Sequence, residues 1–137
     1  MTGKTRSAVI GGIVLGVLYL VESVMKTGLL FLVWPVIGGA LAAYLYARNA
    51  QPPVPASEGA KVGALAGIIG GLILVIIGTP LIYLVLSEVN ARLTIFGQNL
   101  PLDGISLILG VTLIYAGLGL IIATVSGLVT MLIVGKR

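Results

Sequence analysis

The chain has no cysteine and no histidine among its 137 residues. It therefore cannot form disulfides, use a thiol nucleophile, hold zinc in the usual cysteine and histidine sites, bind haem through histidine, or use imidazole as an acid or base. We expect no metal, no cofactor and no catalytic residue, and we predict a protein that is not an enzyme.

Charge is also scarce. Only 9% of the residues are charged and 58% are hydrophobic, with a mean hydropathy of +1.20, whereas soluble domains carry roughly 25% charged residues. So few charges cannot cover a surface that faces water, which makes the lipid bilayer the main solvent. The net charge of +4 does not indicate nucleic-acid binding, because the basic residues are scattered and form no patch.

Four apolar segments follow one another, at about residues 7–24, 29–47, 62–86 and 105–134. A helix needs about 20 apolar residues to cross about 30 Å of hydrocarbon. We predict a single transmembrane domain over residues 1–137, an all-α polytopic bundle of four helices. No small-x-small cleavage site follows the first segment, so we expect a retained helix and not a signal peptide.

The last two segments are longer than a membrane requires. The corresponding helices must tilt, break (Gly117–Gly119 is the expected point) or project from the bilayer. Pro80 predicts a kink in the third helix, because proline removes a backbone donor. Ser57 and Asp103 have the side chains of N-caps for the third and fourth helices.

The connection over residues 87–104 is the longest and fits two structures. Val89, Leu93, Phe96 and Leu100 are spaced as in an amphipathic helix that lies at the membrane interface. The alternation in "RLTIF" fits a small strand or hairpin equally well. If the last two helices project from the bilayer, this loop would cap them and form a docking surface.

Basic residues predict the orientation of the chain. With four helices, both termini and the linker after the second helix share one side, and the basic residues there are Lys4, Arg6, Arg48, Lys61, Lys136 and Arg137. The opposite side holds only Lys26 and Arg92. Six basic residues against two place both termini in the cytoplasm of a protein of the cell membrane.

Small residues recur at intervals of four in every predicted helix. The clearest ladder lies in "GAKVGALAGIIGGLILV" (59–75). Residues four apart lie on nearly one helical face, and such faces let helices approach closely in lipid. The residues that we assign to helix packing are Gly12, Gly16, Gly39, Gly59, Gly63, Gly67, Gly71, Gly119 and Gly127. This ladder is not a phosphate loop, because no following Lys-Ser/Thr pair or preceding strand accompanies it.

Ionisable and polar side chains are few within the apolar segments. No charged residue lies near the centre of any segment, which argues against an ion-coupled transporter. Glu22 and Lys26, spaced i, i+4, predict a weak ion pair at the interface, and an ion site at the outer mouth is the alternative. Thr112, Tyr115 and Thr124 would line a polar path if one exists, although such hydroxyls more often bond to backbone carbonyls.

Two sequence likenesses bear on ancestry. "GGALAAYLYAR" (38–48) is similar to "SGLVTMLIVGK" (126–136), as expected if the two helical hairpins are parallel repeats, although glycine-rich sequence can imitate a repeat. "GGALAAYLYAR", the proline-containing linker and "EGAKVGALAGIIGG" (58–71) also resemble small glycine-rich four-helix membrane proteins of unknown function found in archaea and some bacteria. That resemblance covers roughly residues 36–75. It implies a helical bundle and supplies no catalytic residue.

These observations lead to one main functional hypothesis and two alternatives. The main hypothesis is an accessory or structural subunit that packs through its small-residue helix faces in a larger membrane complex or a homo-oligomer. Its partners would be the lipid bilayer and other membrane subunits or copies of itself, with no nucleic acid. The alternatives are a small permease or channel that works as a dimer, and a membrane component of an export or conjugation system.

Overall fold

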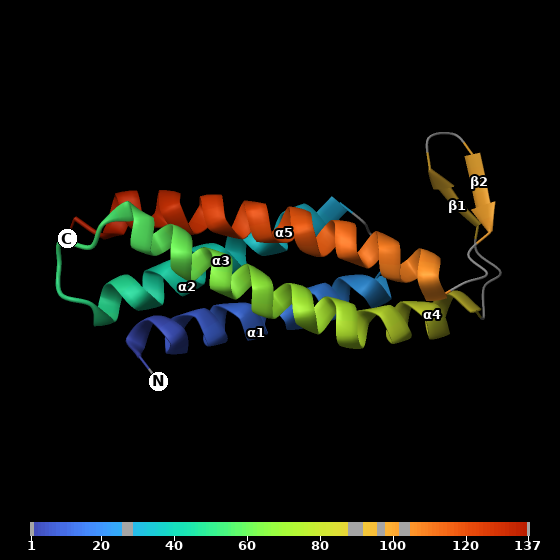
Figure 1. The fold of residues 1–137 in the computed structure, drawn as a ribbon, viewed down its shortest axis with the longest axis horizontal. Helices are drawn as coiled ribbons and strands as arrows, with labels where there is room; N and C mark the ends of the chain where they lie inside the picture. Colours follow the sequence, from blue (N-terminus) through green and yellow to red (C-terminus); the bar gives the residue numbers. More distant parts are fainter. Residues whose placement is uncertain (1, 26–28, 88–91, 96–97, 102–104, 137) are drawn as a thin grey trace.

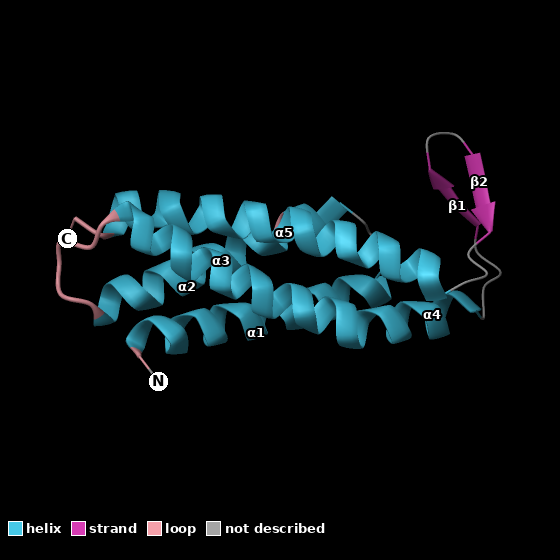
Figure 2. Cartoon of the chain, viewed as in Figure 1, coloured by secondary structure: helices cyan, strands magenta, loops and turns pink. Residues whose placement is uncertain are grey.

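The computed structural model describes residues 2–25, 29–87, 92–95, 98–101 and 105–136, and confirms a bundle of four long helices (Figures 1 and 2). The first two are α1 (Gly3–Met25) and α2 (Trp34–Asn49), the latter preceded by a 3₁₀ turn, η1 (Leu29–Leu32). The third consists of α3 (Ala56–Ile73), a π-helical turn η2 (Leu74–Gly78) and α4 (Thr79–Ser87). The fourth is α5 (Ile105–Val134). All four are long and apolar enough to cross a membrane.

The helices pack in a ring in the order α1, α2, α5, α3, with α2 and α3 also in contact across the middle. Both chain termini and the linker after α2 lie at one end of the bundle, which we call the termini end (Figure 1). The short strands lie at the opposite end, which we call the hairpin end. This arrangement agrees with an even number of membrane crossings.

Two helices begin earlier than their apolar segments. α1 starts at Gly3 and α3 at Ala56, where hydropathy alone placed them at about 7 and 62. Hydropathy marks the part of a helix that lies in lipid, and a polar first turn extends the helix beyond that part. In α3 this turn contains Glu58, which is ion-paired with Lys61 at 2.8 Å and with Lys4 of α1.

The predicted cap of α3 is wrong. Pro55 holds the N-cap position with an extended backbone (φ −67°, ψ 147°), and Ser57 lies within the first turn. Proline has its φ fixed near this value and has no N–H that the helix would need to satisfy. Asp103, the expected cap of the last helix, lies outside the described residues.

The last helix shows no break at Gly117–Gly119. α5 is a continuous helix of 30 residues, about 45 Å at 1.5 Å per residue, so it must tilt or project. The irregularity predicted near Pro80 takes the form of the π-helical turn η2, which immediately precedes α4. A wider turn accommodates a proline that cannot donate to the preceding carbonyls.

The long connection contains a β-hairpin and not the alternative amphipathic helix in the part that is described. β1 (Arg92–Ile95) pairs antiparallel with β2 (Gln98–Pro101), with Arg92 opposite Pro101 and Ile95 opposite Gln98. The strand alternative of "RLTIF" therefore describes these residues.

Candidate functional site

The glycine ladder of α3 faces α5 inside the same chain. Going along α3, Gly59 faces Gly127, Gly63 faces Ala123, Gly67 faces Leu120 and Gly71 faces Ala116. The numbers fall on one helix as they rise on the other, so the two helices are antiparallel. A Cβ at Gly59 or Gly63 would overlap a backbone carbonyl oxygen of α5, and a Cβ at Gly67 would lie 2.9 Å from the Cα of Leu120. The backbones touch at this seam.

The other glycines assigned to helix packing also lie against neighbouring helices. A Cβ at Gly12 would lie 2.6 Å from the Cβ of Ile69, and one at Gly16 would lie 2.6 Å from the Cδ1 of Ile73, both on the third helix. At the remaining positions an added Cβ would overlap an atom of a neighbour: the Ala123 carbonyl oxygen at Gly39, the Tyr19 hydroxyl at Gly119, and the Gly59 carbonyl oxygen at Gly127.

Three glycine doublets mark helices that have two close neighbours. Gly11 faces α2 and Gly12 faces α3; Gly38 faces α1 and Gly39 faces α5; Gly70 faces α1 and Gly71 faces α5. Successive residues are 100° apart around a helix, and in a ring of four each helix has neighbours roughly at right angles. Sequence reasoning at intervals of four missed Gly11, Gly38 and Gly70, and the GG doublets were the signal that would have found them.

The three residues of the predicted polar path lie in separate environments. The buried Thr112 hydroxyl contacts the Thr79 hydroxyl at 2.9 Å and the Ile108 carbonyl oxygen of its own helix at 3.0 Å. The Thr124 hydroxyl donates to the Leu120 carbonyl at 2.7 Å. The Tyr115 ring packs against Phe31 with ring centroids 4.9 Å apart. Each group has a structural partner, and the path itself stays a prediction.

A buried aromatic and polar cluster occupies the hairpin half of the bundle. Tyr19 stacks on Phe31 with ring centroids 5.5 Å apart, and its hydroxyl has no hydrogen-bond partner among the described residues. Glu22 is fully buried, with 0% of its surface exposed. Glu22 therefore lies on the inward face of α1, seven residues after the buried Leu15, and not on the protein surface. The predicted ion pair with Lys26 stays a prediction, because Lys26 lies outside the described residues.

α5 has a glycine-containing face without a neighbour in the described part of the chain. An added Cβ at Gly110 or at Gly117 of α5 would meet no described atom within 4 Å. The large apolar residues around them are exposed, with 65% of Ile114 and 61% of Ile121 accessible. Only 22% of the most apolar window of this helix is buried, against 44% for α1. We call Gly110, Leu113, Ile114, Gly117 and Ile121 the open face of α5.

The described residues hold no group of three side chains suited to bind a metal ion. Comparison of the chain with protein-family models, with curated proteins and with solved structures found no match. The fold and its surfaces are therefore the basis for functional inference.

Proposed function

We propose that this chain is a non-enzymatic accessory or structural subunit of the cell membrane, and that it assembles through the open face of α5 with another subunit or with a second copy. Association of helices in lipid depends on close backbone approach, because the lipid tails are as apolar as the side chains. A subunit of this kind needs a face where a foreign backbone can come close.

The observation that supports the proposal is that most helix glycines pack against a neighbouring helix, whereas two glycines of α5 do not. The ladder of α3 and the doublets of α1, α2 and α3 lie against helices of the same chain. Gly110 and Gly117, seven residues apart and so on nearly one face, have open space instead. Glycine in a helix costs about 1 kcal/mol relative to alanine, and a contact with a partner helix would offset this cost.

The proposed orientation keeps both termini in the cytoplasm. Five described basic residues lie at the termini end, namely Lys4, Arg6, Arg48, Lys61 and Lys136, against Glu58 as the acidic residue of that end. The hairpin end contributes Arg92. A cysteine placed at Thr2 of this cysteine-free chain should resist a membrane-impermeant maleimide in intact cells, and one placed at Gln98 should react. The reverse labelling pattern would show the opposite orientation.

A large side chain placed on the open face of α5 tests whether the protein assembles through this face. We expect wild-type protein in mild detergent or native nanodiscs to run on native mass analysis as an oligomer or with a copurifying subunit. Gly117→Trp should abolish that species. Ile76→Trp, at a residue that is 68% exposed on the third helix, is the matched control and should leave it intact. A strictly monomeric wild-type protein without a copurifying partner would refute the proposal.

A further inference from the structure

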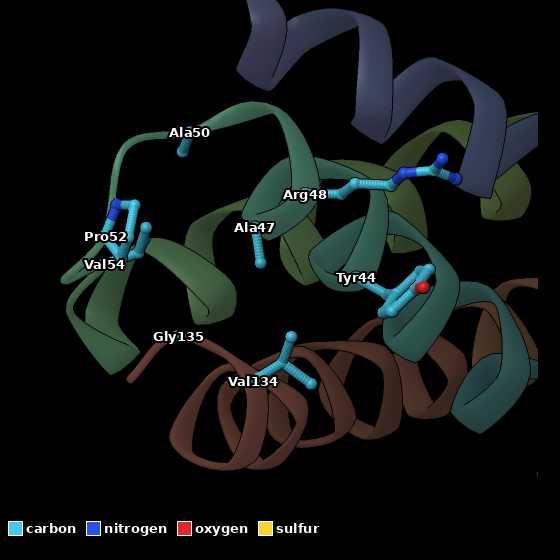
Figure 3. Close-up of a pocket in the computed structure, with 8 residues that line it drawn as sticks. All are labelled: Tyr44, Ala47, Arg48, Ala50, Pro52, Val54, Val134 and Gly135. Atoms are coloured by element: carbon cyan, nitrogen blue, oxygen red, sulfur yellow. The ribbon is translucent and has the colours of Figure 1, made fainter. Parts of the chain in front are cut away.

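A second surface, on the seam between α2 and α5, has the chemistry of a phospholipid site. At the termini end, a pocket of about 390 Å³ lies between the end of α2, the linker that follows and the end of α5 (Figure 3). Ala47 and Val134 point toward one another across it, while the side chains of Tyr44 and Arg48, which also line the pocket, extend away from Pro52 and Val54. The pocket thus combines an apolar wall with a hydroxyl and a guanidinium.

An apolar groove continues the same seam toward the middle of the bundle. This groove, of about 450 Å³, is lined on α2 by Val36 and Ala40 and on α5 by residues between Ile121 and Thr130. Val36 and Ala40 of the groove and Tyr44 and Ala47 of the pocket are spaced four, four and three apart, so groove and pocket lie along one face of α2. Twelve residues from Val36 to Arg48 span about 18 Å at 1.5 Å per residue, close to one leaflet of about 15 Å, half of the ~30 Å hydrocarbon core.

We propose that this seam binds one anionic phospholipid of the leaflet at the termini end, with its phosphate at Arg48 and Tyr44 and an acyl chain along the groove past Ala40. Charge favours that occupant, because five basic residues and one acidic residue lie at this end among those described. Guanidinium groups bind phosphate with paired hydrogen bonds, and basic pockets between helices are suited to anionic headgroups. The site shares only Ile121 with the open face of α5, and the proposed binding does not depend on the proposed assembly.

The experiment titrates the purified, delipidated full chain with phosphatidylglycerol or phosphatidylcholine in mild detergent and counts bound lipids by native mass spectrometry. We expect one phosphatidylglycerol per chain, bound more tightly than phosphatidylcholine. Arg48→Gln should weaken this binding about tenfold, as expected for the loss of one charge-assisted hydrogen bond. Arg6→Gln, which removes the same charge from an exposed residue of the same end, should change it by less than about twofold.

The apolar half of the site is tested by filling the groove. Ala40→Phe should lower phosphatidylglycerol binding while circular dichroism reports unchanged helicity, and inorganic phosphate at equal concentration should compete poorly. Equal effects of Arg48→Gln and Arg6→Gln would overturn the proposal, because they would indicate attraction by net charge alone. Full competition by inorganic phosphate with no effect of Ala40→Phe would overturn the lipid assignment, as would a second copy of the chain found on this seam.

Discussion

Gly63→Ala is the sharpest perturbation of the seam between α3 and α5. The new methyl carbon would overlap the Ala123 carbonyl oxygen and lie 3.1 Å from its carbonyl carbon and 3.2 Å from the Cα of Gly127. These are backbone atoms, which cannot rotate aside as a side-chain end can, so the helices must separate. Overpacking of this kind costs typically about 1–3 kcal/mol, and helix propensity offsets about 1 kcal/mol of it.

Gly117→Ala is the matched control, because it gains the same helix propensity where an added Cβ meets no described atom within 4 Å. The two variants should therefore differ in free energy of unfolding by about 1–3 kcal/mol, with Gly117→Ala equal to or more stable than wild type. Unfolding in mixtures of mild detergent and sodium dodecyl sulfate, followed by far-ultraviolet circular dichroism, measures this difference. Equal stabilities of the two variants would refute the reasoning that the α3 ladder packs on α5.

Two further predictions concern buried groups of the hairpin half. Gly119→Ala should lower the free energy of unfolding of the wild-type protein, because the added Cβ would overlap the Tyr19 hydroxyl. The same change should cost much less in a Tyr19→Phe background, where the nearest ring carbon is 3.2 Å away. Additive effects in a double-mutant cycle, measured in the same unfolding assay, would contradict this contact. Thr79→Val and Thr112→Val should show a coupling energy of about 0.6 kcal/mol, the usual size for hydrogen bonds between helices in lipid, and a coupling of zero would contradict the 2.9 Å bond between the two hydroxyls.

The sequence predicts which face of α3 consists of glycines, but it does not predict which helix packs against that face. The spacing of Gly59, Gly63, Gly67 and Gly71 depends only on helical geometry, and so it can be read from one helix alone. Which helix packs on this face depends on the arrangement of all four helices in the bundle, and the sequence of one helix alone does not determine that arrangement. The GG doublets carry part of that information, because adjacent glycines point toward two neighbours that lie about 100° apart.

Two other features, the burial of Glu22 and the unbroken α5, were not predicted from the sequence. Glu22 looked like a surface residue because glutamate near the end of a transmembrane segment usually reaches water. Its position on the buried face of α1, three residues after Tyr19, decides its burial instead. The unbroken α5 shows that glycines such as Gly117 do not break a helix whose backbone hydrogen bonds have no competing water in lipid.

The proposed role depends most directly on what lies against the open face of α5 in the native membrane. The chain contains no cysteine, so a maleimide photocrosslinker can be attached at Gly117→Cys alone and activated in native membranes. We expect a discrete crosslinked protein adduct from Gly117→Cys and only lipid adducts from Ile76→Cys, the control at an exposed residue of the third helix. Lipid adducts alone at both positions would contradict the assignment of this face as the assembly surface.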